Sequence, residues 1–138
     1  MSIKFFKYKR NVFLNKELKE KYMPKMQVET IADFDMIAEM IEKKSIMSRG
    51  DILGVLAKLE IASLWMLENG HPVSLGLLGT FYPAIEVQMV DTPEEVKRSL
   101  IKRFKIIFKP SKFFKKRFKS IDFVLGDSKV KVVKYKKK

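Results

Sequence analysis

Cysteine is absent from this chain of 138 residues, and histidine and tryptophan occur once each. Without cysteine there is no disulfide, no thiolate nucleophile and no thiolate metal site. The one histidine, His71, follows Gly70 in a turn-like segment without a carboxylate cluster, which favours a surface residue over a ligand or general base. Neither a catalytic triad nor a Gly-x-x-x-x-Gly-Lys-Ser/Thr phosphate loop can be recognised. The sequence therefore predicts a protein that is not an enzyme and that needs no metal, cofactor or small-molecule substrate.

Long hydrophobic runs are also missing. No stretch approaches the roughly 18 apolar residues that span a bilayer, and residues 1–13 scatter bases among aromatic residues, unlike a signal peptide. We therefore expect a cytoplasmic protein that does not enter a membrane. A hydrophobic fraction of 46% can supply a core, and the length predicts one domain.

Positive charge is concentrated at the two ends of the chain. Residues 92–138 hold 17 Lys or Arg against 4 Asp or Glu, which is the whole net charge of +13. Residues 1–25 carry a net charge of +6 (8 bases, 2 acids), and residues 26–91 carry −6 (4 bases, 10 acids). This segregation favours a polyanionic partner, such as DNA, RNA or an anionic membrane surface.

The first thirty residues predict two strands. Residues 3–13 are rich in aromatic and β-branched residues with bases between them, so we predict an edge strand. Residues 14–25 are interpreted as a polar connection, because the Met23-Pro24 pair disfavours helix. Residues 26–31 alternate and predict a second short strand.

Two helices follow. Asp33 is predicted to begin the first, which stops near Ser45 and has apolar residues at helical spacing, namely Phe34, Ile37, Ala38 and Ile41. Ser48 and Asp51 form a capping box for the second: the Ser48 hydroxyl accepts from the amide of Asp51, and the Asp51 carboxylate reaches back to the cap amide. The second helix is predicted to end at about Asn69-Gly70.

The second helix has two apolar stripes rather than one. A surface helix of a small monomer needs a single stripe, so the other face is expected to meet a partner chain in an obligate dimer. The first stripe is Ile52, Val55, Leu56, Leu59, Ala62 and Met66, and the second is Leu53, Ala57, Ile61, Leu64 and Trp65.

The second half predicts a β arm and a basic helix. Residues 73–90 are strand-like with a glycine turn, residues 91–99 break the pattern, and residues 100–109 return as a strand. Pro110 suits the first turn of a basic helix, and residues 121–135 suggest a strand, a Gly-Asp turn and another strand. In the returning strand one face is apolar (Phe104, Ile106, Phe108) and the other mostly basic (Arg103, Lys105, Ile107, Lys109).

Residues 103–120 combine eight bases with five phenylalanines. A single amphipathic membrane helix is disfavoured because Pro110 divides the stretch and its first half has a period of two. A disordered tail would leave the phenylalanines unburied. The bases are therefore expected to form a positioned face that neutralises phosphates without reading sequence. Because the phenylalanines fit core positions, double-stranded DNA is favoured over the single strands that stack on exposed rings.

These features resemble the HU/IHF family of bacterial histone-like DNA-binding proteins. The resemblance covers about residues 30–120 and is carried by four motifs, namely Ser48-x-x-Asp51, Val73-x-Leu75, Gly79-Thr80-Phe81 and Phe108-Lys109-Pro110-Ser111-Lys112. It implies an α+β fold with two N-terminal helices, an antiparallel sheet with an extended arm, a C-terminal basic helix and an intertwined dimer. It also implies a nucleoid-associated architectural protein that holds DNA between its β arms. On this interpretation residues 1–138 are one domain, with an N-terminal β extension (1–29), the family core (30–120) and a C-terminal strand and basic tail (121–138).

The resemblance also assigns the DNA contacts. Lys109 and Lys112 match family bases at the Phe-Lys-Pro corner that contact phosphates. The returning arm adds Arg98, Lys102, Arg103 and Lys105, and the basic helix adds Lys115, Lys116 and Lys119, for which a solvated helix face is an equal alternative. The expected partners are double-stranded DNA and a second copy of the chain, with a paralogue in its place as an alternative.

Three departures from the family pattern keep other functions open. Leu77 and Leu78 stand at the family's corner Gly and Phe, and Ser111 replaces a Gly after the proline. The arm tip, residues 91–95, is acidic where the family has bases and an intercalating proline, and a minor groove repels carboxylates. Kinking by Pro93 is thus not predicted, and DNA bending stays open. A protein-interaction module on the same dimer scaffold and RNA binding are the alternatives.

Overall fold

The computed structural model of the chain describes residues 2–132, which form an α+β fold. The chain divides into two compact units. The terminal unit combines Met1–Ile31 with Phe118–Lys138, and the central unit is Ala32–Arg117. The expected basic tail after residue 132 lies outside the described residues.

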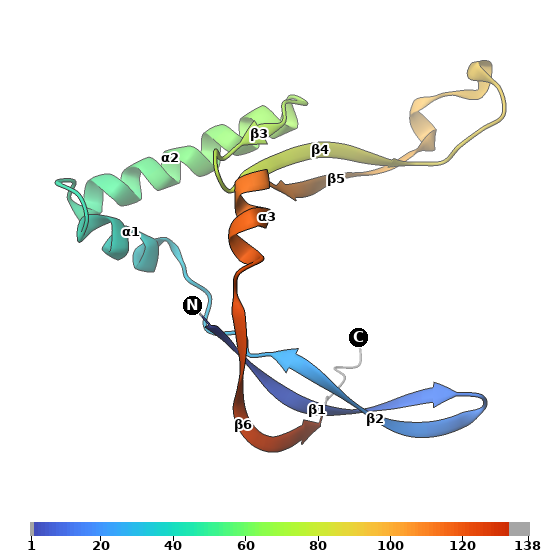
Figure 1. The fold of residues 1–138 in the computed structure, drawn as a ribbon. Helices are drawn as coiled ribbons and strands as arrows, with labels where there is room; N and C mark the ends of the chain where they lie inside the picture. The colour runs from blue at the N-terminus through green and yellow to red at the C-terminus, as the bar shows by residue number, and fades with distance from the viewer. Residues whose placement is uncertain (1, 133–138) are drawn as a thin grey trace. The chain divides into compact units, whose positions relative to one another are not determined.

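The terminal unit is a three-stranded sheet of β1 (Ser2–Leu14), β2 (Glu17–Met26) and β6 (Asp122–Val132), in the order β2-β1-β6 (Figure 1). β1 and β2 form a hairpin whose two turn residues, Asn15 and Lys16, have φ of 51° and 65°. Positive φ at both central residues matches the right-handed twist of the strands.

Three predictions for this segment are wrong. β1 was expected at an edge, but it is the central strand, because β6 returns from the far end of the chain to pair with it in parallel. The expected polar connection at 14–25 is mostly strand, and only Met26 of the predicted strand at 26–31 is in one. Pro24 is compatible with β2 because β2 is an edge strand, where a missing N–H costs no ladder bond.

β6 is a single strand with an irregularity where the sequence predicted a Gly-Asp turn between two strands. Its register against β1 shifts between Leu125, opposite Phe5, and Val130, opposite Lys7. Gly126 lies at this shift under the Phe6 ring: an added Cβ would lie 2.9 Å from a ring carbon, so a larger residue would displace the ring. The predicted continuation over 133–135 lies outside the described residues.

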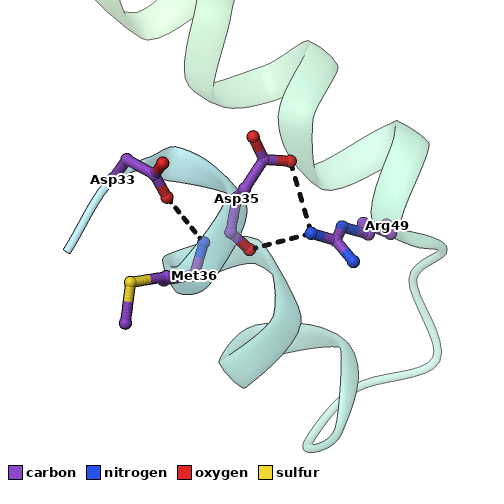
Figure 2. Close-up of polar contacts among 4 residues, drawn as sticks. All are labelled: Asp33, Asp35, Met36 and Arg49. Atoms are coloured by element: carbon purple, nitrogen blue, oxygen red, sulfur yellow. Dashed lines mark hydrogen bonds and ion pairs between the residues drawn. The ribbon is translucent and has the colours of Figure 1, made fainter.

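The central unit begins with the two predicted helices, α1 (Phe34–Glu42) and α2 (Arg49–Glu68). The Asp33 carboxylate caps α1 by accepting from the Met36 amide at 3.0 Å, as predicted. Figure 2 shows this cap and the link between the helices, in which the Arg49 guanidinium lies 3.3 Å from the Asp35 carboxylate.

The α2 cap is confirmed with one difference. The Ser48 hydroxyl accepts from the Asp51 amide at 3.2 Å, as expected, but the Asp51 carboxylate accepts from the Ser48 hydroxyl at 2.6 Å and not from the cap amide. α2 ends at the predicted place, with Asn69 as its C-cap and Gly70 at a φ of +84°.

A three-stranded antiparallel sheet, ordered β3-β4-β5, follows α2. It consists of β3 (Val73–Ser74), β4 (Gly79–Val87) and β5 (Ile101–Pro110), and β4 and β5 run side by side as the long arm in Figure 1. Two short 3₁₀ turns, η1 (Pro93–Glu95) and η2 (Arg98–Leu100), lie in the connection at the arm tip. The last helix, α3 (Lys112–Phe118), starts two residues after Pro110. Pro110 was predicted to lie in the first turn of this helix, but it is instead the last residue of β5.

The central unit buries few side chains within one chain. The buried apolar residues are Ala38, Ile52 and Leu67, with 0%, 3% and 8% of their surface exposed. Phe81 and Phe108 pair across the arm base with ring centroids 4.9 Å apart. Six large apolar side chains of α2 remain exposed, namely Val55, Leu59, Ile61, Leu64, Trp65 and Met66.

Candidate nucleic-acid interface

The register of β4 and β5 gives the arm two chemically different faces. Directly opposed residues of an antiparallel pair share a face. Phe81 opposes Phe108 and Ile85 opposes Phe104, so these side chains share the apolar face. The other face carries Arg103, Lys105 and Lys109 from β5, with Thr80, Tyr82, Ala84 and Glu86 from β4 and the apolar Ile107. The alternation expected from the sequence is therefore present, and it gathers three of the predicted DNA-contacting bases.

Arg103 is the one base of this face with an acidic partner among residues 2–132. Its Nε lies 2.5 Å from the Glu86 carboxylate directly across the strand pair. The Arg103 side chain is nonetheless 71% exposed. An exposed ion pair of this kind contributes little to stability, but it lowers the positive charge that the arm presents to a phosphate.

Lys109 is positioned by an aromatic residue that the sequence alone did not single out. Its ammonium lies 4.9 Å from the centre of the Tyr82 ring, which is a cation–π contact across the strand pair. The two residues are diagonal neighbours, because Lys109 opposes Thr80 and Ile107 opposes Tyr82. This contact depends on the register of β4 against β5, which the sequence pattern of a single strand does not contain.

The corner that joins the arm to α3 is fixed by Gly79 and Ser111. Gly79 has a φ of +145°, and an added Cβ would collide with the Lys109 carbonyl and lie 2.9 Å from the Phe108 ring, so only glycine fits. Ser111 replaces the family glycine, and its hydroxyl has two partners: it donates to the Leu77 carbonyl and accepts from the Phe114 amide at 3.0 Å. The second contact caps the start of α3.

The remaining predicted bases are exposed but are not all gathered on this face. Lys112, Lys115 and Lys116 lie on α3, where spacings of three and four residues place them on one side. Lys102 lies at the register shift of β5, between Arg103 and Ile101, and Arg98 lies in η2 at the arm tip. Lys119 follows α3 and belongs to the terminal unit.

The tip of the arm is acidic, as in the sequence. Asp91, Glu94 and Glu95 are all exposed. The Thr92 hydroxyl donates to the Glu95 carboxylate at 3.0 Å across the first 3₁₀ turn, and the Thr92 side chain makes no cap hydrogen bond to the backbone of that turn. This arrangement leaves the tip with negative charge beside Pro93.

Residues 2–132 contain no cluster of three or more His, Cys, Asp or Glu side chains that could hold a metal ion. In the same part of the chain, no helix is long and apolar enough to cross a membrane.

The helix pair, the glycine corner and the two-stranded arm define an HU-type domain. The family described as "HU domain fused to wHTH, Ig, or Glycine-rich motif" (HU-HIG) matches residues 1–124, and the chain belongs to this family. The resemblance to HU found in the sequence is thus confirmed.

One solved structure extends the comparison. It is a protein from Bacteroides vulgatus, provisionally assigned as a bacterial DNA-binding protein, with 14% sequence identity and a TM-score of 0.53. The match covers 91% of this chain and 49% of that one, so this chain spans about half the length of its neighbour. At this identity the likeness concerns the fold. No curated protein matches the chain.

Proposed function

We propose that this protein binds double-stranded DNA without catalysis and largely without sequence preference, as a nucleoid-associated protein. The observation that carries the proposal is the basic face of the arm. It displays Arg103, Lys105 and Lys109 on one side of a strand pair, and α3 adds four exposed bases, namely Lys112, Lys115, Lys116 and Arg117. Membership of an HU-type family and the assignment given to the Bacteroides vulgatus protein support the same ligand.

The proposed mechanism is phosphate neutralisation. Lysine and arginine side chains on a rigid strand pair release the counterions condensed on DNA, and this gain does not depend on base sequence. The aromatic Tyr82 keeps the Lys109 ammonium near the surface of the arm, which reduces the side-chain entropy that binding costs. Bending of DNA is not part of the proposal, because three carboxylates surround Pro93 at the tip.

The proposal includes a homodimer in which α2 lies at the interface. Val55 and Leu59 are one helical turn apart and are 58% and 44% exposed, and Trp65 is 59% exposed. Apolar side chains that are exposed on both stripes of the helix indicate an interface. Burial of each such side chain contributes about 1.5–3 kcal/mol, so a second copy of the chain would supply the core that one copy lacks.

The test is fluorescence anisotropy of a labelled 30-base-pair duplex across 50–200 mM salt. We expect micromolar or tighter binding that weakens by about 10³-fold over this range, as for a protein with several phosphate contacts. Lys109→Glu with Lys112→Glu is expected to weaken it strongly and to make it less dependent on salt. The matched control, Lys43→Glu with Lys44→Glu after α1, makes the same charge change away from the arm and should bind nearly as wild type.

Competitors separate the alternatives. Single-stranded DNA and duplex RNA at equal salt should displace the labelled duplex less well than duplex DNA. Stronger competition by RNA would replace DNA with RNA as the ligand. Absence of binding at 50 mM salt would refute the proposal and leave the dimer as a protein-interaction scaffold.

A further inference from the structure

The sheet of the terminal unit has a basic face of its own. None of its bases is among the DNA contacts that the sequence predicted. The β1–β2 register places Phe6 and Tyr8 on this face with Arg10 beside them, opposite Lys25, Met23 and Lys21. Lys19 follows two residues from Lys21, and β6 adds Lys131 opposite Tyr8. The bases of this face are Lys4, Arg10, Lys19, Lys21, Lys25 and Lys131.

The contacts within the sheet confirm that these side chains share one side. Lys131 lies 3.6 Å from the centre of the Phe6 ring, and Lys25 lies 5.0 Å from the centre of the Tyr8 ring. The same four residues line an open pocket of about 460 Å³, together with Met26, Gln27 and Val28. The two rings therefore hold two ammonium groups at the surface of the sheet.

The opposite face of the sheet is different. It carries Phe5 opposite Met26 and Phe13 opposite Leu18, with only two bases, Lys7 and Lys9. Lys9 is 2.6 Å from the Glu20 carboxylate, and this hydrogen bond raises the pKa of Lys9 above its ordinary value. In contrast, Lys4, Lys19, Lys21, Lys25 and Lys131 form no ion pair with any acid among residues 2–132. Free positive charge is thus concentrated on one face.

The geometry favours phosphates over bases as the ligand. The Phe6 ring is covered by Lys131 and packs on Gly126, and the Tyr8 ring is covered by Lys25. Rings in this state are not open platforms for unpaired bases, which is how single-strand binders use aromatic residues. A row of cations without stacking platforms is suited to the high phosphate density of a duplex.

The dimensions also fit. Lys19, Lys21 and Lys25 lie along the exposed edge strand β2, and the row from residue 19 to residue 25 is about 20 Å long at about 3.3 Å per residue. One DNA strand places a phosphate at about every 3.4 Å of helix axis, so the row is as long as about six base pairs of a duplex.

We propose that the Lys19–Lys21–Lys25 face of the terminal sheet, with Phe6 and Tyr8 as supports for its lysines, is a second binding site for the backbone of double-stranded DNA. The site is separate from the arm and α3. It rests on the proposed function only in taking the same ligand, since its residues are different. A chain with two such sites contacts DNA through both of its units.

The test combines two double variants in the full chain. One reverses the face (Lys19→Glu with Lys21→Glu), the other reverses the arm (Lys109→Glu with Lys112→Glu), and a third protein carries both. Salt-dependent anisotropy with a duplex then reports the number of phosphate contacts, because the slope of log K against log salt changes by about 0.9 for each contact. The matched single variants are Lys21→Glu and Lys7→Glu, which reverse one exposed lysine on opposite faces of the same sheet.

We expect the slope to fall by about 1.8 in the face variant and by about 0.9 in Lys21→Glu, with no change in Lys7→Glu. A face variant whose slope and affinity equal those of Lys7→Glu would overturn this inference while leaving arm binding intact. The opposite result, loss of binding in the face variant but not in the arm variant, would refute the arm mechanism and keep the second site. No binding by the wild-type protein refutes both.

Two further measurements keep the result interpretable. Circular dichroism and thermal melting must show that Lys19→Gln with Lys21→Gln, the neutral version, folds like wild type, and this version should still lose about 1.8 in slope. Single-stranded DNA and vesicles rich in anionic lipid are then compared with the duplex at equal salt. Tighter binding of either by the wild type but not by the face variant would overturn the choice of duplex DNA.

Discussion

Glu86 accepts a hydrogen bond from Arg103 across the strand pair of the arm, with 2.5 Å between Oε2 and Nε. Lys105 and Lys109 share this face, and among residues 2–132 neither forms an ion pair. The arm therefore carries a negative charge beside Arg103. If the proposed function holds, Glu86 competes with a DNA phosphate for the Arg103 guanidinium.

Glu86→Gln is thus expected to strengthen DNA binding. The change frees the Arg103 guanidinium and removes a charge that repels phosphate, so the slope of log K against log salt should steepen by about 0.9. Anisotropy at several salt concentrations measures it. Glu39→Gln is the control, because Glu39 is also exposed and paired with a lysine (Lys43), but it lies on α1. Equal affinity of the two variants would show that Arg103 does not contact DNA.

Val55→Glu with Leu59→Glu is expected to convert a dimer into monomers. Both side chains are exposed in the single chain, and charged substitutions on an ordinary surface cost less than about 0.5 kcal/mol. At an apolar interface they leave carboxylates buried, which is far more costly. Sedimentation velocity should give about twice 16.2 kDa for the wild type and 16.2 kDa for the variant.

The control for the dimer experiment is Leu18→Glu at the tip of the β1–β2 hairpin, where the side chain is 68% exposed. This variant should keep the mass of the wild type. A wild-type protein that sediments as a monomer at micromolar concentration would contradict the proposed interface.

Gly79→Ala is expected to destabilise the protein by about 1–3 kcal/mol. A φ of +145° is strained for alanine, and the new Cβ would collide with the Lys109 carbonyl on the neighbouring strand. Urea unfolding followed by circular dichroism measures the loss. Gly50→Ala is the contrast, because no atom lies within 4 Å of its added Cβ and alanine favours helix by up to about 1 kcal/mol. If both variants unfold at the same urea concentration, the close approach at Gly79 is not rigid.

Ser111→Ala should cost about 1–2 kcal/mol. The substitution removes the cap of α3 and leaves the Leu77 carbonyl and the Phe114 amide without their hydroxyl partner. The same unfolding measurement applies, with Ser99→Ala in the exposed arm tip as the control. Equal stability of the two variants would mean that water replaces the Ser111 hydroxyl at no cost.

Local signals predicted the central unit well. Asp33, Ser48 and Gly70 mark helix ends through capping chemistry that acts within four residues, and all three were placed correctly. The alternation in β5 was equally local, since one apolar face and one basic face require only a period of two. The family motifs then identified the arm, the corner and α3, although the DNA contacts assigned to them remain predictions.

Pairings between distant residues could not be predicted in the same way. β1 has the composition of an edge strand, and only its partnership with β6, more than 100 residues later, makes it central. β2 was missed because its charges and Pro24 weaken the strand pattern, while its stability derives from its pairing with β1. The Tyr82–Lys109 and Arg103–Glu86 contacts likewise depend on register, which single-strand patterns do not contain.

The parallel pairing of β1 with β6 has a consequence for biosynthesis. The hairpin of β1 and β2 leaves the ribosome before the central unit, yet its third strand begins at Asp122, about a hundred residues later. At about 5–20 residues per second this interval lasts roughly 5–20 s. A two-stranded hairpin is only marginally stable in water, so during this time its apolar face is available to chaperones or to other nascent chains. The central unit is synthesised within the interval, and the terminal sheet therefore becomes complete only after the central unit has been made.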